Sequence, residues 1–592
     1  MTPETRIRDH LILLYGQEKA EHLSARLQER LSRFRGRNPD LQKRATNPAE
    51  RLTERDAFLI TYGDQVTEPG EAPLQTLGEV LESTIAGVVS GVHILPFFPY
   101  SSDDGFSVID YTQVDPKLGT WEDIERLGRA FRLMFDAVIN HVSAQSKWFQ
   151  AFVDGTPRYE DYFIVVEPDA DLSDVVRPRA KPLLTPVQTA RGKEWVWTTF
   201  SDDQIDLNYG NPEVLLDIVD VLLLYVEEGA DVIRLDAIAY IWKEVGTPSI
   251  HLEEAHRVVK LFRAIFDAVA PDVILISETN VPHEENVSYF GDGTDEAQMV
   301  YQFPLPPLVL HAFHTGDATR LARWAAGLNA PSDSTTFFNF LASHDGIGIR
   351  PVEGILRRSE IQALVDITRQ HGGFVSHKTN GDGSRGVYEL NISYFDALSN
   401  PNGEEPLSLQ VRRFLASQAI MLSLAGVPGI YVHSLFGSRS DREGVETTGR
   451  YRSINREKFR RRQLEQALSD PTSLRHRVFY AYLDLIRARA SHRAFHPNAG
   501  QRVLLAEEAG NESLFALVRT SGDGEPLLCI HNLSSSEQDF QAPLESLGFA
   551  GGVRLQDLIS GAIYAAWDDG SALTLRPYQV VWLRGGRSDA VH

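Results

Sequence analysis

The sequence predicts an α/β protein built on a parallel (β/α)8 barrel, the TIM-barrel architecture. We expect two inserted subdomains, an N-terminal helical extension and a C-terminal antiparallel β domain. Two observations support this fold class. Short apolar runs alternate with amphipathic helical segments between residues 57 and 497, as is typical of βα units around a parallel sheet. Charged residues also follow several of these runs directly, which is expected where barrel strands end at a functional face.

The predicted elements follow one another regularly along the chain. Residues 1–56 are rich in Arg, Glu, Leu and Gln, with leucines at helical spacing, and we expect helices there. Barrel strands are predicted at 57–62, 92–97, 133–139, 232–235, 273–276, 299–303, 336–342 and 427–432. Helices are predicted at 74–86, 121–131, 212–228, 251–269 and 411–424. A doubly wound open sheet is the alternative, but no Gly-x-Gly-x-x-Gly motif follows the first strand.

Two long interruptions and a change of pattern define the predicted domains. The barrel domain spans 57–497, and proline-rich or polar stretches at about 142–206 and 346–406 predict inserted subdomains. From 498 to 592 short β-like runs alternate with turns rich in Gly and Asn, which predicts a separate C-terminal β domain.

Composition excludes several classes of function. The 592 residues carry a net charge of -23, so nucleic acid and anionic membranes are not expected as partners. The single cysteine, Cys529, allows no internal disulfide and is consistent with a reducing compartment. No signal peptide or membrane-spanning segment is recognisable, so we expect a cytoplasmic protein.

Carboxylates follow the predicted strands and point to a shared site. Arg234 and Asp236 stand two residues apart, so their side chains lie on the same side of a strand. A structural ion pair in the barrel core is the alternative explanation for this pair. Several carboxylates gathered at one barrel end are costly unless chemistry uses them. The groups at the strand ends are Asp136 with Asn140 and His141, Arg234 with Asp236, Glu278, and His344 with Asp345.

These residues stand in four motifs that resemble the signature regions of the α-amylase superfamily. The motifs are Asp136-Ala-Val-Ile-Asn-His141, Arg234-Leu-Asp236, Ser277-Glu278-Thr279 and Ser343-His344-Asp345. The resemblance covers roughly residues 57–590. It implies Asp236 as the nucleophile, Glu278 as the acid/base and Asp345 as the residue that stabilises the transition state. It also implies that His141, Arg234 and His344 line the glucose pocket.

Within the superfamily the chain is most similar to the sucrose phosphorylase group. This resemblance rests on motifs such as Asp104-Gly-Phe-Ser-Val-Ile-Asp110, Gln204-Ile-Asp206 and Arg452-Ser-Ile-Asn-Arg456. It implies that Asp64 and Arg452 hold the glucosyl hydroxyls. Phe200, Gln204 and Tyr240 would form the pocket wall. Tyr111 replaces the histidine usual in the group, so its contact with glucose is in doubt.

The predicted acceptor side resembles glucosylglycerate phosphorylases and not the sucrose-specific members. The relevant residues are Arg350, His377, Lys378 and Arg385, which follow the His344-Asp345 motif. Arg350, Lys378 and Arg385 would otherwise be solvated loop charges. The resemblance implies a retaining phosphorylase that uses inorganic phosphate as co-substrate and an anionic acceptor, D-glycerate.

Several alternatives remain open at this stage. Sucrose, sucrose 6-phosphate or glucosylglycerol could be the substrate, and a hydrolase of the same fold or a non-catalytic binding protein are further options. Asn140 would suit a calcium site, but the sucrose phosphorylase group needs no metal, so we expect neither a metal nor another cofactor. The expected partners are a small sugar substrate and phosphate. A homodimer is compatible with the sequence.

Overall fold

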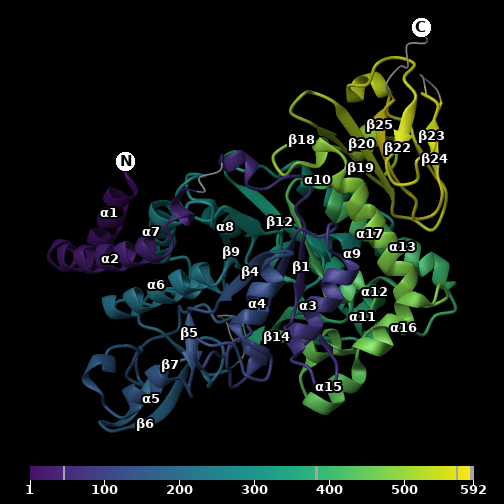
Figure 1. The fold of residues 1–592 in the computed structure, drawn as a ribbon. Coiled ribbons are helices and arrows are strands. Elements are labelled where there is room, and N and C mark those ends of the chain that lie inside the picture. Colours follow the sequence, from purple (N-terminus) through teal and green to yellow (C-terminus); the bar gives the residue numbers. More distant parts are fainter. Residues whose placement is uncertain (44–46, 180, 380–384, 568–570, 587–592) are drawn as a thin grey trace.

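The computed structural model describes residues 1–43, 47–179, 181–379, 385–567 and 571–586. Within these ranges, eight parallel strands close into a barrel in the order β1-β16-β12-β11-β10-β9-β4-β3 (Figure 1). The barrel strands are β1 Phe58–Thr61, β3 Gly91–Ile94, β4 Arg132–Ala137, β9 Ala230–Leu235, β10 Ile274–Ser277, β11 Met299–Tyr301, β12 Thr336–Phe340 and β16 Val427–Tyr431. Each predicted barrel strand is present, so the predicted fold class is confirmed.

The barrel strands are buried on both faces because helices surround them. In β9, for example, Val232, Ile233 and Leu235 are fully buried. Apolar β-branched and leucine side chains of this kind favour a parallel sheet that is covered by helices. The predicted covering helices are α3 Pro73–Thr84, α4 Trp121–Gly128, α6 Pro212–Glu227, α7 Glu253–Val269 and α13 Leu407–Ser423. Helix α6 begins with Pro212 in its first turn and is capped by the Asn211 side chain, which accepts from the Glu213 amide.

The first insertion contains a small unit of its own between β4 and α6. Its elements are β5 His141–Ser143, α5 Lys147–Val153, β6 Leu184–Thr189, β7 Gly192–Trp197 and β8 Gln204–Asp206. A separate small core formed by Val166, Val175, Leu183 and Trp197 packs inside it. Strand β5 pairs with β8, so both ends of the insertion return to the barrel next to each other.

The second insertion follows β12 and is more regular than its polar sequence suggested. It contains β13 Ile347–Gly348, α11 Arg358–Gln370, β14 Phe374–Thr379, β15 Arg385–Asn391 and α12 Tyr394–Leu398. The strands form a sheet in which β15 lies between β13 and β14. Helix α11 buries Leu364, Val365 and Thr368 against its neighbours, and most of its other polar residues are exposed.

The N-terminal extension consists of α1 Pro3–Tyr15 and α2 Gln17–Arg37, which lie beside α6 and α7 (Figure 1). Ion pairs join the extension to these barrel helices. Arg6 Nη2 lies 2.6 Å from Asp267 Oδ2, and Arg30 Nε lies 3.0 Å from Asp220 Oδ2. The leucines at helical spacing, among them Leu23, face inward and are buried.

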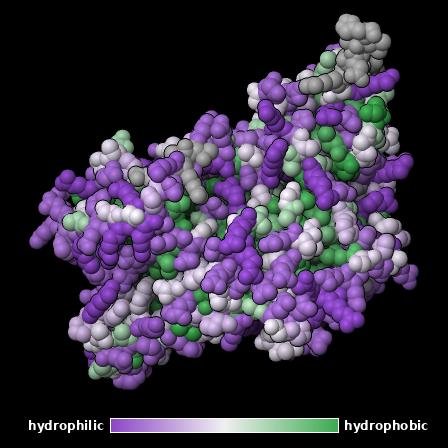
Figure 2. Space-filling model, viewed as in Figure 1, coloured by the Kyte–Doolittle hydropathy of each residue, from purple (hydrophilic) through white to green (hydrophobic). Residues whose placement is uncertain are grey.

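The surface seen in Figure 2 is mostly hydrophilic, and apolar residues appear there only in small separate groups. Among the residues that the structure describes, no helix is both long and apolar enough to cross a membrane.

The C-terminal β domain packs against the barrel end that carries α10 Thr319–Ala326 and α17 Leu474–Ala490 (Figure 1). Its main antiparallel sheet runs in the order β18-β19-β20-β25-β22-β23. These strands are β18 Gly500–Leu504, β19 Leu514–Thr520, β20 Pro526–Asn532, β25 Val580–Gly585, β22 Leu555–Asp557 and β23 Ile563–Tyr564. The outer face of the sheet carries a core of its own, which includes Phe540 and Trp567.

Two fully buried arginines donate to backbone carbonyls near this junction. Arg519 joins the domain to the barrel, whereas Arg489 ties α17 to other segments of the barrel domain. Arg519 on β19 donates to Ser423 O at 3.0 Å, His496 O at 2.8 Å and Gly500 O at 3.2 Å. Arg489 on α17 donates to the carbonyls of Asp56, Leu422, Gly426 and Phe495. The rigid guanidinium fork satisfies several carbonyls that would otherwise be buried without a donor.

We therefore expect Arg519→Met to destabilise the protein by roughly 3 kcal/mol, because three carbonyls at this junction lose their donor at about 1 kcal/mol each. Urea unfolding followed by tryptophan fluorescence measures this change. Arg584→Met, at an exposed position of the same domain, is the control and should change stability by less than about 0.5 kcal/mol. Equal effects of the two substitutions would contradict this role for Arg519.

Candidate active site

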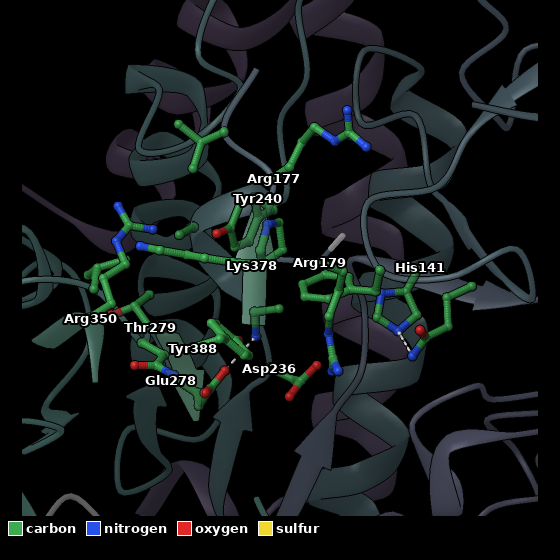
Figure 3. Close-up of a pocket in the computed structure, with 18 of the residues that line it drawn as sticks. His141, Arg177, Arg179, Asp236, Tyr240, Glu278, Thr279, Arg350, Lys378 and Tyr388 are labelled. Carbon is green, nitrogen blue, oxygen red and sulfur yellow. Dashed lines mark hydrogen bonds between the residues drawn. The ribbon is translucent and has the colours of Figure 1, made fainter. Parts of the chain in front are cut away.

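Three carboxylates stand just beyond the carboxyl ends of barrel strands and line one cavity of about 570 Å³. Asp236 follows β9, Glu278 follows β10, and Asp345 lies in the loop after β12. Figure 3 shows Asp236 and Glu278 on the same side of the cavity, with Arg350, Lys378 and Arg177 on the opposite side. The structure therefore brings together the three residues that the sequence predicted to be catalytic.

The backbone around the nucleophile candidate is unusual. Ala237, directly after Asp236, has a left-handed conformation with φ of 49°. Its amide donates to Glu278 Oε2 at 3.1 Å, so the turn also orients the second carboxylate. Strained backbone of this kind persists only where surrounding contacts hold it, and it is common at active sites.

A buried arginine organises the carboxylates from below. Arg234 Nη1 lies 2.9 Å from Asp236 Oδ1, and its Nη2 lies 3.8 Å from Glu278 Oε1. The same guanidinium also pairs with Asp136, which in turn accepts from His93 Nε2 at 2.7 Å. Arg234 was predicted to line the glucose pocket, but it lies behind the nucleophile and does not reach the cavity.

Burial and the distance from Arg234 give the carboxyl groups of Asp236 and Glu278 different pKa values. Burial raises the pKa of Glu278 to about 7, and the more distant Arg234 offsets this only in part. Burial raises the pKa of Asp236 to about 6, although Arg234 donates to it directly. Asp236, which is closer to Arg234, therefore loses its proton more readily than Glu278, an order that suits a nucleophile and an acid respectively.

Asp345 is held ionised by a different set of cations. Arg452 Nη1 lies 2.5 Å from Asp345 Oδ1. Burial by itself raises the pKa of Asp345. Arg452, His344 and Arg456 outweigh this effect and together hold that pKa well below its ordinary value. A fixed negative charge at this place suits a group that binds hydroxyls while positive charge develops on the sugar.

Most of the predicted pocket residues line the same cavity. His344 stacks on Phe106 with 4.7 Å between ring centroids, and Phe200 packs edge-to-face on Tyr240 at 5.6 Å. His141 and Gln204 both contact the Phe106 carbonyl, at 2.9 and 2.8 Å. The predicted residues that line the cavity beside the catalytic three are His141, Phe200, Gln204, Tyr240, His344, Arg350, Lys378 and Arg452.

Asp64 was predicted to hold glucose hydroxyls, and the structure places it elsewhere. It lines a second pocket and pairs with Lys458 at 2.5 Å. Asp103, which the sequence analysis missed, is an acidic residue that does line the active cavity. Burial by itself raises the pKa of Asp103, but Arg179, Arg452 and Arg456 outweigh this effect and lower that pKa below its ordinary value. The sequence analysis recognised the motif that begins at Asp104. Only the loop conformation shows that Asp103, the residue before this motif, lines the cavity.

His377 also departs from its prediction, because it is exposed and does not line the cavity. Its neighbour Lys378 does line it, since successive side chains of β14 point to opposite sides. Tyr111 is a structural residue here. Its buried hydroxyl donates to the carbonyls of Val138 and His141 at 2.7 and 3.1 Å.

Asn140, a residue type that would suit a calcium site although none was predicted, faces a lysine. Lys243 Nζ donates to Asn140 Oδ1 at 2.6 Å and lies 2.9 Å from Asp206 Oδ2, and its side chain is almost fully buried. The ammonium thus occupies the position from which a cation would contact these two oxygens. No group of three His, Cys, Asp or Glu side chains suited to a metal occurs among the described residues.

Cations from both insertions surround the mouth of the cavity. Arg350 lies 3.4 Å from Glu285, and Lys378 lies 3.3 Å from Glu353, so each has a partly exposed carboxylate partner. Arg177 and Arg179 also line the cavity, and neither forms an ion pair within the part of the chain that the structure describes. The sequence analysis did not single out this pair, whose only signal was the Arg-Pro-Arg run in the first insertion.

The family model for the α-amylase catalytic domain matches residues 87–346, which include all three catalytic candidates. The structure also resembles sucrose 6F-phosphate phosphorylase from Thermoanaerobacter thermosaccharolyticum. That match has a TM-score of 0.70 and 25% identity, and it covers 88% of this chain and 98% of the other.

Comparison with curated proteins gives relatives along nearly the whole chain. A glucosylglycerate phosphorylase of Allomeiothermus silvanus is 52% identical, with 98% of this chain and 99% of the relative covered. A glucosylglycerate phosphorylase of Escherichia coli is 44% identical, with 98% and 100% covered. A sucrose phosphorylase of Agrobacterium vitis is 32% identical, with 74% and 88% covered. Together with the barrel and its three carboxylates, these relatives show that the chain belongs to the sucrose phosphorylase group of the α-amylase superfamily, beside the glucosylglycerate phosphorylases.

Proposed function

We propose that this protein is a retaining glycoside phosphorylase. It cleaves 2-O-α-D-glucosyl-D-glycerate with inorganic phosphate and releases α-D-glucose 1-phosphate and D-glycerate. The observation that carries the proposal is the group of cations directly above the catalytic carboxylates, in a protein whose net charge is -23. Local cations of this kind are needed to recruit anions that the rest of the surface repels. The names of the relatives at 44–52% identity support the same substrate.

The first half of the reaction forms a glucosyl-enzyme intermediate. Asp236 attacks the anomeric carbon, the bond to the glycerate oxygen breaks, and Glu278 donates its proton to that oxygen. Asp345 binds sugar hydroxyls as positive charge develops on the ring. The product of this step is a β-glucosyl ester of Asp236 and free glycerate.

In the second half the deprotonated Glu278 acts as a base. It takes the proton of a phosphate hydroxyl while that oxygen attacks the anomeric carbon and displaces the Asp236 carboxylate. Two inversions give net retention, so the sugar phosphate is the α anomer. Glu278 returns to its protonated state, which restores the enzyme.

The two anions have chemically distinct candidate sites at the cavity mouth. Arg350 lies beside Tyr240, and its planar fork suits the carboxylate of glycerate. Arg350 already pairs with Glu285, which is partly exposed and 3.4 Å away. This ion pair is weak, so the carboxylate of glycerate can replace Glu285 in a bidentate contact. Arg179 has no ion-pair partner among the described residues, and we propose it for phosphate.

The competing hypothesis is that the acceptor is phosphorylated or neutral. Cations at the mouth would also suit sucrose 6-phosphate, whereas sucrose and glucosylglycerol would leave them unpaired. Relatives named for these substrates are only 28–32% identical, which favours glycerate. A hydrolase would use water in place of phosphate, and the need for phosphate in turnover separates the two reactions.

We propose further that the enzyme needs no metal or organic cofactor and acts on small molecules in the cytoplasm. The Lys243 ammonium between Asn140 and Asp206 supports the first point, because it satisfies the oxygens that a cation would use. The single cysteine, which is buried, is compatible with a reducing compartment. A homodimer stays a prediction.

The double displacement makes a stereochemical prediction. Freshly released glucose 1-phosphate should be the α anomer by ¹H NMR, and quenched enzyme should carry one glucosyl unit on Asp236 by mass spectrometry. Asp236→Asn should abolish both signals, since an amide cannot displace the leaving group. Release of the β anomer would contradict the mechanism.

The pKa order predicts a bell-shaped pH profile for cleavage of the natural glucoside. Below about pH 6 Asp236 gains a proton and stops acting as a nucleophile, and above about pH 7 Glu278 loses the proton it must donate. The natural glucoside should therefore be cleaved fastest between these limits.

Glu278→Gln tests the basic limb of that profile. Fluoride leaves without protonation, so the variant should lose far less activity with α-glucosyl fluoride than with the glucoside, and its profile should lack a basic limb. Equal losses on both donors would remove Glu278 from the acid role.

The acceptor assignment predicts a selective defect in Arg350→Ala. Losing a charge-assisted hydrogen bond costs about 1.5 to 3 kcal/mol, so the reverse reaction with glycerate should weaken by roughly 10-fold to 150-fold. The reaction with glycerol should scarcely change. Arg358→Ala, at an exposed position on α11, is the matched control and should affect neither acceptor. Wild type that prefers glycerol or fructose to glycerate would overturn the anionic-acceptor proposal.

A further inference from the structure

A buried carboxylate next to the glucose subsite takes no part in the mechanism above. Glu389 lies on β15 in the second insertion and is only 2% exposed. It does not line the cavity, so it does not contact the sugar. A buried glutamate is costly unless it is paired, and this one has a single charged partner among the described residues, Arg452.

The pairing uses two nitrogens of that guanidinium. Arg452 Nε donates to Glu389 Oε2 at 3.1 Å, and Nη2 donates to Glu389 Oε1 at 2.5 Å. The remaining nitrogen, Nη1, lies 2.5 Å from Asp345 Oδ1. Arg452 therefore bridges two carboxylates, and its bidentate contact with Glu389 fixes the plane of the guanidinium.

The three cations beside Asp345 approach it most closely at the same oxygen. Arg452, Arg456 and His344 come nearest to Oδ1, at 2.5, 3.9 and 3.5 Å. Among the described residues, no side chain donates a hydrogen bond to Oδ2. One oxygen thus faces the cations, and the other stays available for sugar hydroxyls.

The fold places Glu389 at this position through a close backbone approach. In the register of the sheet Glu389 is opposite Gly348 of β13 and Ser376 of β14. Gly346, directly after Asp345, allows the approach, because a Cβ there would lie 2.8 Å from the Glu389 Cβ. The His344-Asp345-Gly346 loop and β15 therefore pack directly against each other.

We infer that Glu389 is a positioning residue for the transition-state carboxylate. By occupying Nε and Nη2 of Arg452, it restricts Arg452 to a single contact with Asp345. Without Glu389 the guanidinium turns its fork onto Asp345 and competes with the sugar for Oδ2. Strand β15 also carries Tyr388, which lines the cavity, so the acceptor side and the glucose subsite share one support. This inference rests on the retaining chemistry proposed above, but not on the identity of the acceptor.

The test is Glu389→Gln, which keeps the shape of the side chain and removes its charge. With α-glucosyl fluoride and phosphate, kcat should fall about 10-fold or more while KM changes less than about threefold, because Asp345 acts mainly in the transition state. The preference for glycerate over glycerol in the reverse reaction should not change. The reference is turnover of α-glucosyl fluoride by the wild-type enzyme. If the wild-type enzyme does not turn it over, that result counts against the proposed function and not against the role of Glu389.

A double-mutant cycle distinguishes positioning from general structural support. If Glu389 acts through Arg452, Glu389→Gln should cost less than about threefold when added to Arg452→Lys, because the pairing is already broken. Asp396→Asn is the matched control. Asp396 is equally buried on α12 of the same insertion and pairs with Arg439 at 2.7 Å, away from the cavity. It should lower thermal stability without lowering kcat.

Three results would overturn the inference. Retention of wild-type kcat by Glu389→Gln would show that Arg452 needs no second carboxylate. A full additional loss in the Arg452→Lys background would show that Glu389 acts on something else. A changed preference between glycerate and glycerol would place it in the acceptor subsite.

Discussion

The buried guanidinium of Arg234 is the interaction on which the active site depends. It stands inside a closed barrel, where an isolated charge would be very unfavourable, and it is balanced by Asp136, Asp236 and Glu278. Its position also differentiates the two reacting carboxyls, because it donates to Asp236 and lies farther from Glu278. One fixed cation therefore allows two neighbouring acids to have different protonation states at the same pH.

Two other buried or half-buried cations around the cavity likewise contact more than one oxygen-bearing side chain. Lys243 holds Asn140 and Asp206 at the base of the first insertion, and Arg452 holds Asp345 and Glu389 at the start of the second. In each case one long basic side chain joins a barrel loop to an inserted segment. The insertions are thus attached to the catalytic machinery through ion pairs as well as through apolar packing. This explains how long segments outside the barrel come to define its active site.

At the other end of the barrel, arginines serve a purely structural purpose. Arg489 and Arg519 are fully buried, and their donors meet backbone carbonyls where two domains and the start of the barrel converge. Carbonyls at such junctions have no strand or helix partner, and burying them unpaired would be costly. The rigid fork of arginine solves this with one side chain, which lysine with its single nitrogen could not do.

The amino-acid sequence alone determined the barrel, its eight strands and the three catalytic carboxylates. The strands are local features, because a buried strand is an apolar run that periodicity reveals. The carboxylates were recognised by their position after these runs, and their catalytic roles came from the resemblance to the α-amylase superfamily. The choice between Asp64 and Asp103, the orientation of His377 away from the cavity, and the position of Arg234 behind Asp236 were decided only by tertiary structure. Each depends on how a loop turns or on which face of a strand meets the cavity, and a shift of one residue reverses the outcome. The pairing of Glu389 with Arg452 joins residues far apart in the sequence, and only the folded chain brings them together.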